Sequence, residues 1–158
     1  MKNDKLSFLL KYFSSYEIRF TEDGDFAEII NPFYTENVKV EYIADDDFNP
    51  FIVYFAFQHC HMCDEEDIVE YINEIVNENK FSIEFFKNGK RRFGSDITAQ
   101  ELERLSYEKL EQHTGYWGIT KLKQMADAFK VRGWNPNRNF DAVFVINNGE
   151  SVTIQKIG

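Results

Sequence analysis

The sequence predicts an α+β fold built mainly on an antiparallel sheet of β-hairpins, with about 7 to 8 strands and about 3 to 4 helices packed on it. One observation behind this prediction is that strand-like runs flank three turn pairs, Asp23-Gly24, Asn88-Gly89 and Asn148-Gly149. Such pairs readily adopt the positive φ angles of two-residue hairpin turns. The other is that 158 residues, of which 43% are hydrophobic, suit a single globular domain over 1–158.

The first part of the chain is expected to form one helix followed by strands. Apolar residues at helical spacing predict a short amphipathic helix over residues 6–13. Alternating polar and apolar residues predict strands over 16–21, 25–30 and 38–42. The run Phe51–Phe57 is apolar on both faces, which is typical of a strand covered on both sides, so we expect it in the middle of the sheet.

The middle of the chain is expected to alternate helices with a hairpin. The acidic residues 64–67 suit the first turn of a helix, because the helix dipole favours negative charge there. Residues 81–93 predict a hairpin around the Asn-Gly pair. A helical stretch follows over 99–113, with a capping box at its start and Ser106 as a candidate interruption.

The last part of the chain is expected to form one more helix and a closing hairpin. Apolar residues from Ile119 to Phe129 recur at helical spacing, and Gly133 is placed to end that helix. Residues 140–147 and 150–157 flank the third turn pair and predict two antiparallel strands.

Charge is distributed unevenly along the chain. The net charge is −9, but residues 1–80 carry 6 basic and 18 acidic side chains, whereas residues 81–158 carry 12 basic and 9 acidic. An acidic protein repels nucleic-acid phosphates and anionic membranes at long range, and it attracts basic partners. We therefore expect no nucleic-acid partner, no membrane partner, and a basic protein as the partner of the acidic half.

The sequence lacks the usual features of a secreted or membrane-spanning protein. No apolar run approaches the ~18 to 20 residues that span a bilayer. The apolar part of residues 6–13 is short, interrupted by Ser7 and Lys11, and not followed by a small-residue cleavage site, so it makes a poor signal peptide. We expect a cytoplasmic protein whose two cysteines, Cys60 and Cys63, are not a disulfide framework.

The segment His59-Cys60-His61-Met62-Cys63 has the most unusual composition in the chain. If a strand continues through it, His59, His61 and Cys63 share one face, where their side chains suit a tetrahedral ion such as zinc. His113 or a carboxylate would then complete the ligand set. In the alternative, the imidazoles are partly exposed at a strand end and the thiols are small core residues.

The same cysteines resemble the active-site pair of the thioredoxin-like family, because Cys60-x-x-Cys63 follows an apolar strand and precedes a predicted helix. Pro136, followed by a terminal hairpin, resembles that family's proline and closing strands. The resemblance implies a thiol-redox role for the pair. The chain departs from the family because acidic residues 64–67 follow directly, and their carboxylates oppose thiolate formation.

Two surface features are weaker candidates for binding. Lys87, Lys90, Arg91 and Arg92 surround a hairpin turn, where solvated basic side chains are expected. The aromatic residues of segment 115–118 form either an exposed patch for a partner or part of a buried core.

Two functions from different classes fit these features. One is a non-enzymatic interaction module in which Asp45, Asp46 and Asp47 contact a basic partner; a small bacterial-type immunity or antitoxin-like protein is one version. The other is a metal-binding or thiol-redox enzyme centred on residues 59–63. The sequence has no glycine-rich phosphate loop, Gly-x-Ser-x-Gly elbow or His-Glu-x-x-His motif, which favours the non-enzymatic module.

Overall fold

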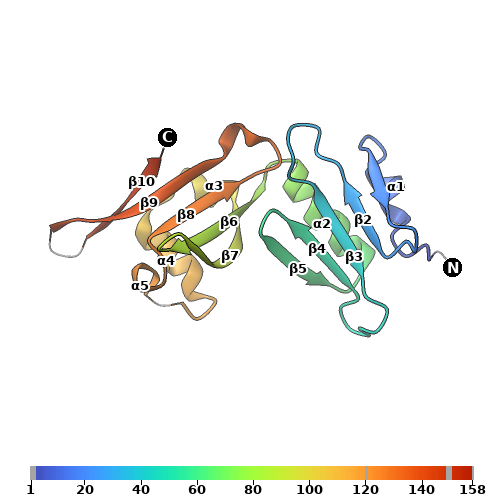
Figure 1. The fold of residues 1–158 in the computed structure, drawn as a ribbon, viewed down its shortest axis with the longest axis horizontal. Coiled ribbons are helices and arrows are strands. Elements are labelled where there is room, and N and C mark those ends of the chain that lie inside the picture. The colour runs from blue at the N-terminus through green and yellow to red at the C-terminus, as the bar shows by residue number, and fades with distance from the viewer. Residues whose placement is uncertain (1–2, 120, 149–150, 158) are drawn as a thin grey trace.

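The computed structural model describes residues 3–119, 121–148 and 151–157. Its strands form two antiparallel sheets of five strands each, which lie side by side in an elongated molecule (Figure 1). The predicted α+β fold with antiparallel pairing is confirmed. The described part of the chain contains ten strands and five α-helices, somewhat more than expected.

The first sheet has the order β1-β2-β3-β4-β5, so each strand pairs with its neighbour in the sequence. Its strands are β1 (Ile18–Phe20), β2 (Phe26–Ile29), β3 (Val38–Tyr42), β4 (Phe51–Phe55) and β5 (Gln58–Met62). The helices of this half are α1 (Phe8–Tyr12) and α2 (Glu65–Val76). The Asp64 carboxylate accepts a hydrogen bond from the Asp67 backbone N–H at 2.9 Å, and this cap fixes the start of α2.

The second sheet has the order β10-β9-β8-β6-β7. Its strands are β6 (Lys80–Lys87), β7 (Lys90–Thr98), β8 (Ala128–Arg132), β9 (Phe140–Ile146) and β10 (Val152–Ile157). Its helices are α3 (Ala99–Glu103), α4 (Tyr107–Gly115), α5 (Leu122–Met125) and the 3-10 turn η1 (Pro136–Arg138). The capping box predicted at Thr98 and Glu101 is confirmed, and Ser106 interrupts the helical stretch as the cap of α4.

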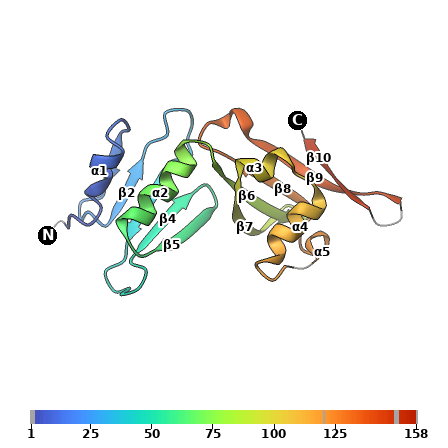
Figure 2. The same ribbon diagram turned by 180° about the vertical axis from the view of Figure 1, so that it is seen from behind.

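The helices α2, α3 and α4 lie on the same side of the molecule, which leaves the other face of each sheet open (Figure 2). Each sheet packs its covered face on its own hydrophobic core. The first core includes Leu9, Ile29, Val40, Val53, Ile68 and Ile72. The second includes Phe81, Ile83, Phe85, Ile97, Leu110 and Phe129.

Trp134 ties the two halves together. It follows β8 of the second sheet, but its side chain is 1% exposed and packs in the first core. Its ring makes edge-to-face contact with Tyr16 at a centroid distance of 5.7 Å. The Asn31 side chain donates a hydrogen bond to the Trp134 carbonyl at 2.8 Å, so both polar and apolar contacts join the two halves at Trp134.

The edge strands β5 and β7 form a second junction between the sheets. The Gln58 amide donates to the Asp96 carboxylate at 3.2 Å. The Arg91 guanidinium donates to the Phe57 carbonyl at 2.7 Å and pairs with Glu84 at 2.7 Å. Arg91 is therefore a structural link rather than the solvated hairpin side chain that the sequence suggested.

The apolar run 51–57 does not form a single strand in the middle of the sheet. Strand β4 ends at Phe55, and a turn at Ala56 and Phe57 reverses the chain into β5. Ala56 adopts φ 54°, a left-handed conformation that is uncommon outside glycine. The central strand is β3, and β5 is the edge.

The helix predicted over 119–129 is wrong. Among the described residues of this segment, only Leu122–Met125 are helical, and Ala128–Arg132 form strand β8. Phe129 and Val131 are buried and alternate with half-buried Lys130 and Arg132, so the segment has the two-residue period of a strand. Pairing with β6 on one side and β9 on the other outweighs the helical spacing of the earlier apolar residues.

The predicted hairpin at Asn88-Gly89 is confirmed, but the turn at Asp23-Gly24 is longer than the predicted two residues. The Thr21 N–H donates to the Phe26 carbonyl across it, and of the turn pair only Gly24 has a positive φ, 80°. Asn88 and Gly89 have φ angles of 51° and 78°, and they join β6 to β7. Strands β9 and β10 pair as predicted, although Gly149 of their turn lies outside the described residues. None of the helices formed by the described residues is long and apolar enough to cross a membrane.

Candidate functional site

A groove of about 400 Å³ lies between the edge strand β5 and helix α2. It is lined by Asn49, Cys60, His61, Met62, Cys63, Asp67, Glu70, Tyr71, Glu74 and Lys80. We call it the acidic groove, because three of these residues are carboxylates from α2. Lys80 is the one cation among them, and its ammonium lies 2.8 Å from Glu74 and 3.7 Å from Asp96. Its charge is therefore already neutralised within the protein.

The β5 residues divide between the two faces of the first sheet. Cys60 and Met62 pack against the first core, whereas His59 and His61 are exposed. The two imidazole rings lie 5.3 Å apart between centroids, and His59 also contacts the Tyr54 ring. The predicted pairing of the two histidines on one strand face is therefore present, and it lies on the face opposite the Cys60 thiol.

Cys63 does not continue the face of the two histidines, because β5 ends at Met62. Its sulfur lies near the cap of α2, 3.7 Å from an Asp64 oxygen and 3.9 Å from an Asp67 oxygen. In the described part of the chain, Cys63, Asp64 and Asp67 are the one group of three potential ligand residues whose ligand atoms all lie within 4.8 Å of one another. The structure therefore gathers a thiol with two carboxylates, and does not bring it together with His59 and His61.

Both thiols are in surroundings that oppose the thiolate. Burial raises the pKa of the Cys60 thiol, and the nearby Asp96 carboxylate adds to the effect. Desolvation, followed by the charges of Asp64 and Asp67, raises the pKa of the Cys63 thiol. Both cysteines are free. The predicted redox pair thus lacks the electropositive setting that activates such cysteines in enzymes.

The acidic loop between β3 and β4 lies beside this segment. The register pairs Phe51 with Met62, so residues just before β4 lie near the end of β5, and Asn49 lines the groove. Figure 1 shows the loop projecting beyond the end of the sheet. The loop with the predicted partner-binding residues and the predicted metal and redox residue Cys63 therefore lie at the same end of the first sheet, whereas His59 lies toward the β4–β5 turn.

The three aspartates of this loop have different roles. The Asp46 carboxylate accepts hydrogen bonds from the backbone N–H groups of Phe48 and Asn49 at 3.0 and 2.9 Å. These bonds lower the pKa of the Asp46 carboxyl, and His61 adds a smaller electrostatic contribution. Asp46 therefore builds the turn. Asp45 and Asp47 are exposed and remain available for a partner.

A second polar cluster, which the sequence did not reveal, lies on the other sheet. The His113 ring places Nδ1 2.9 Å from Glu101 and Nε2 3.1 Å from the Ser95 hydroxyl. A serine, a histidine and a carboxylate in this order have the connectivity of a nucleophilic triad. Residues from β7, α3 and α4 meet here through tertiary packing, and no local sequence motif marks them.

The hydrogen bonds of this cluster argue against nucleophilic catalysis. Nε2 of His113 also lies 2.9 Å from the Asp96 carbonyl, and the Ser95 hydroxyl donates to the same carbonyl at 2.8 Å. A nitrogen that faces a carbonyl must carry hydrogen, so it is not free to accept the serine proton. Ser95 is also buried. The cluster instead fastens α4 to α3 and β7.

Comparisons with protein-family models, with curated proteins and with solved structures found no match for this chain. Its function is therefore inferred from its own geometry and charge.

Proposed function

We propose that the chain is a non-enzymatic interaction module, and that the acidic end of its first sheet binds a basic protein partner. A small immunity-like or antitoxin-like protein is one form that such a module takes. The observation that carries the proposal is that the β3–β4 loop, with its exposed Asp45 and Asp47, lies at the end of the first sheet where β5 ends, and Asn49 of the loop lines the groove beside the carboxylates of α2.

The charge at this end is not balanced within the protein. Six acidic residues of the β3–β4 loop and of α2 are exposed: Asp45, Asp47, Glu65, Glu66, Asp67 and Glu70. None of them belongs to an ion pair within the described residues. Like charges held close together repel one another, and a cationic surface relieves that repulsion. Such an arrangement favours fast association with a basic partner.

An aromatic side chain accompanies the charge. Phe48 lies directly after the three aspartates, and it is 85% exposed. Exposed aromatic residues are typical anchors of protein interfaces, because they bury a large apolar area on binding. We therefore expect the partner to combine basic residues with an apolar pocket that receives Phe48.

The proposal can be tested with two synthetic twelve-residue peptides of equal charge, one alternating lysine with leucine and the other alternating lysine with serine. The first variant, Asp45→Lys with Asp47→Lys, reverses charge and keeps the turn-forming Asp46. We expect it to slow association of both peptides about tenfold at low salt in stopped-flow measurements. The matched control is Glu103→Lys with Glu108→Lys, two exposed residues of the second half.

The second variant, Phe48→Ala, separates the apolar contribution from charge. It should weaken binding of the lysine–leucine peptide and leave the lysine–serine peptide unaffected. Equal slowing by the loop variant and by the control would mean that only net charge matters, and the proposed surface would then be rejected.

A second candidate function is zinc binding by Cys63, Asp64 and Asp67, which the mutual separation of their ligand atoms within 4.8 Å favours. The reactivity of Cys63 distinguishes the two functions, because a bound zinc ion holds the thiolate and blocks its alkylation.

A further inference from the structure

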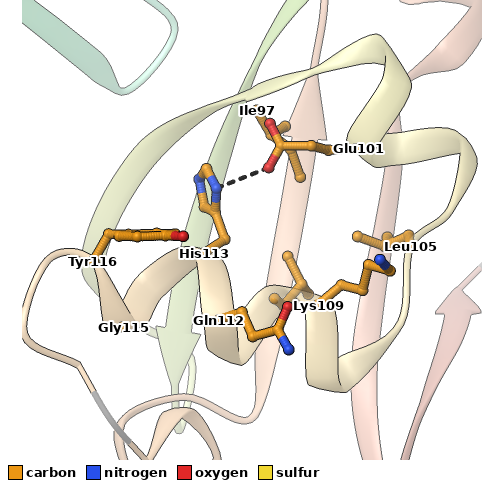
Figure 3. Close-up of a pocket in the computed structure, with 9 residues that line it drawn as sticks. Ile97, Glu101, Leu105, Lys109, Gln112, His113, Gly115 and Tyr116 are labelled. Atoms are coloured by element: carbon orange, nitrogen blue, oxygen red, sulfur yellow. Dashed lines mark ion pairs between the residues drawn. The ribbon is translucent and has the colours of Figure 1, made fainter.

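A separate pocket of about 550 Å³ lies on the helical side of the second sheet, between β7, α3 and α4. Its volume falls in the range of about 300 to 1,000 Å³ that is typical of small-molecule sites. Figure 3 shows the lining side chains arranged around an open centre. Ile97, Leu105 and Leu110 supply apolar surface, and Tyr116 stands at one side with 89% of its surface exposed.

Glu101 and His113 form an ion pair in this pocket, and both side chains also make hydrogen bonds within the protein. One Glu101 oxygen binds His113, and the other accepts hydrogen bonds from the backbone N–H and the hydroxyl of Thr98 at 3.1 and 3.0 Å. The second ring nitrogen of His113 faces Ser95 and the Asp96 carbonyl. These groups therefore stabilise the wall of the pocket, and few of their hydrogen-bonding positions remain for a ligand.

Lys109 is the other charged residue that lines this pocket. It is exposed, and no ion pair or aromatic ring engages it within the described residues. Figure 3 shows its side chain reaching toward Leu105 across the pocket from Glu101 and His113. The pocket thus offers apolar surface next to one unpaired cation, and Gln112 beside it adds a hydrogen-bonding group.

We propose that this pocket binds a small organic anion with an apolar body, such as a medium-chain or aromatic carboxylate. The apolar body lies on Ile97, Leu105 and Leu110, and the carboxylate pairs with the Lys109 ammonium. The site is independent of the acidic groove, because it belongs to the other sheet and attracts a ligand of opposite charge.

The test uses octanoate as the probe and 1-octanol as its uncharged counterpart. Titration followed by amide NMR shifts at His113 and Tyr116 should give a dissociation constant on the order of 1 mM for octanoate. Lys109→Gln should weaken octanoate binding about fivefold and leave octanol binding unchanged. Leu105→Asp should abolish the binding of both, because it replaces apolar surface of the pocket with a hydrated carboxylate.

Lys90→Gln at the β6–β7 turn is the matched control, since it removes an exposed lysine far from the pocket. It should leave octanoate binding unchanged. Two results would overturn the proposal: no shift at His113 and Tyr116 at 10 to 20 times the expected constant, or equal weakening by Lys109→Gln and Lys90→Gln. Folding of each variant is checked by the unchanged amide spectrum outside the pocket.

Discussion

Cys63 shows how a single residue takes its chemistry from its neighbours. Its thiol lies at the cap of α2 beside Asp64 and Asp67. Desolvation is the largest cause of the raised pKa of this thiol, and the charges of the two carboxylates raise it further. A raised thiol pKa lowers the thiolate fraction at neutral pH. In a Cys60→Ser background, we expect iodoacetamide to alkylate Cys63 more slowly at pH 7 than it alkylates a free cysteine, with a rate that rises as pH increases.

A matched variant isolates the cause. Asp64→Asn keeps a good helix cap, and Asp67→Asn keeps the size of the side chain, so the double variant removes two negative charges at little cost to α2. Alkylation at pH 7 should become about threefold faster. Unchanged rates would show that the carboxylates do not control the thiol. Protection that a chelator reverses would instead support the zinc function.

Individual site residues were predictable from sequence to different degrees. The unusual composition of residues 59–63 singled out this segment in the sequence, and the structure places it along edge strand β5 with Cys63 just beyond the end of the strand. The proximity of the β3–β4 loop to the end of that segment was not predictable, because it depends on the β4–β5 turn. That turn contains Ala56 with φ 54° in place of the glycine or asparagine that would have marked it in the sequence.

At the scale of elements, the β6–β7 hairpin holds the two sheets together through Arg91. Its guanidinium bridges the Phe57 carbonyl of one half and Glu84 of the other. Glu84 is 2% exposed, and burial raises the pKa of its carboxyl despite the nearby Arg91. Arg91→Ala would leave a buried carboxylate without its ion-pair partner, so we expect a loss of about 2 kcal/mol in the free energy of unfolding by urea at pH 7.

The pH dependence of this loss follows from Glu84. A carboxyl with a raised pKa in the folded state favours folding when it is protonated, and that contribution disappears as the pH rises through the folded-state pKa. The deficit of Arg91→Ala should therefore shrink at acidic pH, where Glu84 is protonated. Arg92→Ala, which removes an exposed neighbour, should change stability by no more than about 0.5 kcal/mol. A deficit that does not vary with pH would contradict this account.

Elements with local signals were predicted well, and elements set by distant pairing were not. Helix α2 begins at its Asp64 cap, and the Asn88-Gly89 turn joins two strands, because both signals act within a few residues. Strand β8 was mistaken for helix, because the apolar residues before it have helical spacing. Its identity comes from pairing with β6, a strand that lies about forty residues earlier in the chain.

At the scale of the whole molecule, two sheets with separate cores raise the question of whether they unfold together. Trp134 comes from the second half and is buried in the first core, and the Tyr34 hydroxyl donates to the Gly133 carbonyl beside it. The first core is therefore incomplete without the second half in place. We therefore expect a single cooperative transition, with 1–158 behaving as one unit.

Two tryptophans make this testable. In a Trp117→Phe variant, fluorescence reports only on Trp134 in the first core, whereas far-UV circular dichroism reports on both sheets. The two urea transitions should coincide in midpoint and steepness. Trp134→Phe should lower the midpoint measured by circular dichroism, because it shrinks the side chain that bridges the halves. If the Trp134 signal changed at a lower urea concentration than the circular dichroism, the first sheet would unfold independently, and the bridge would not be strong enough to couple the two halves.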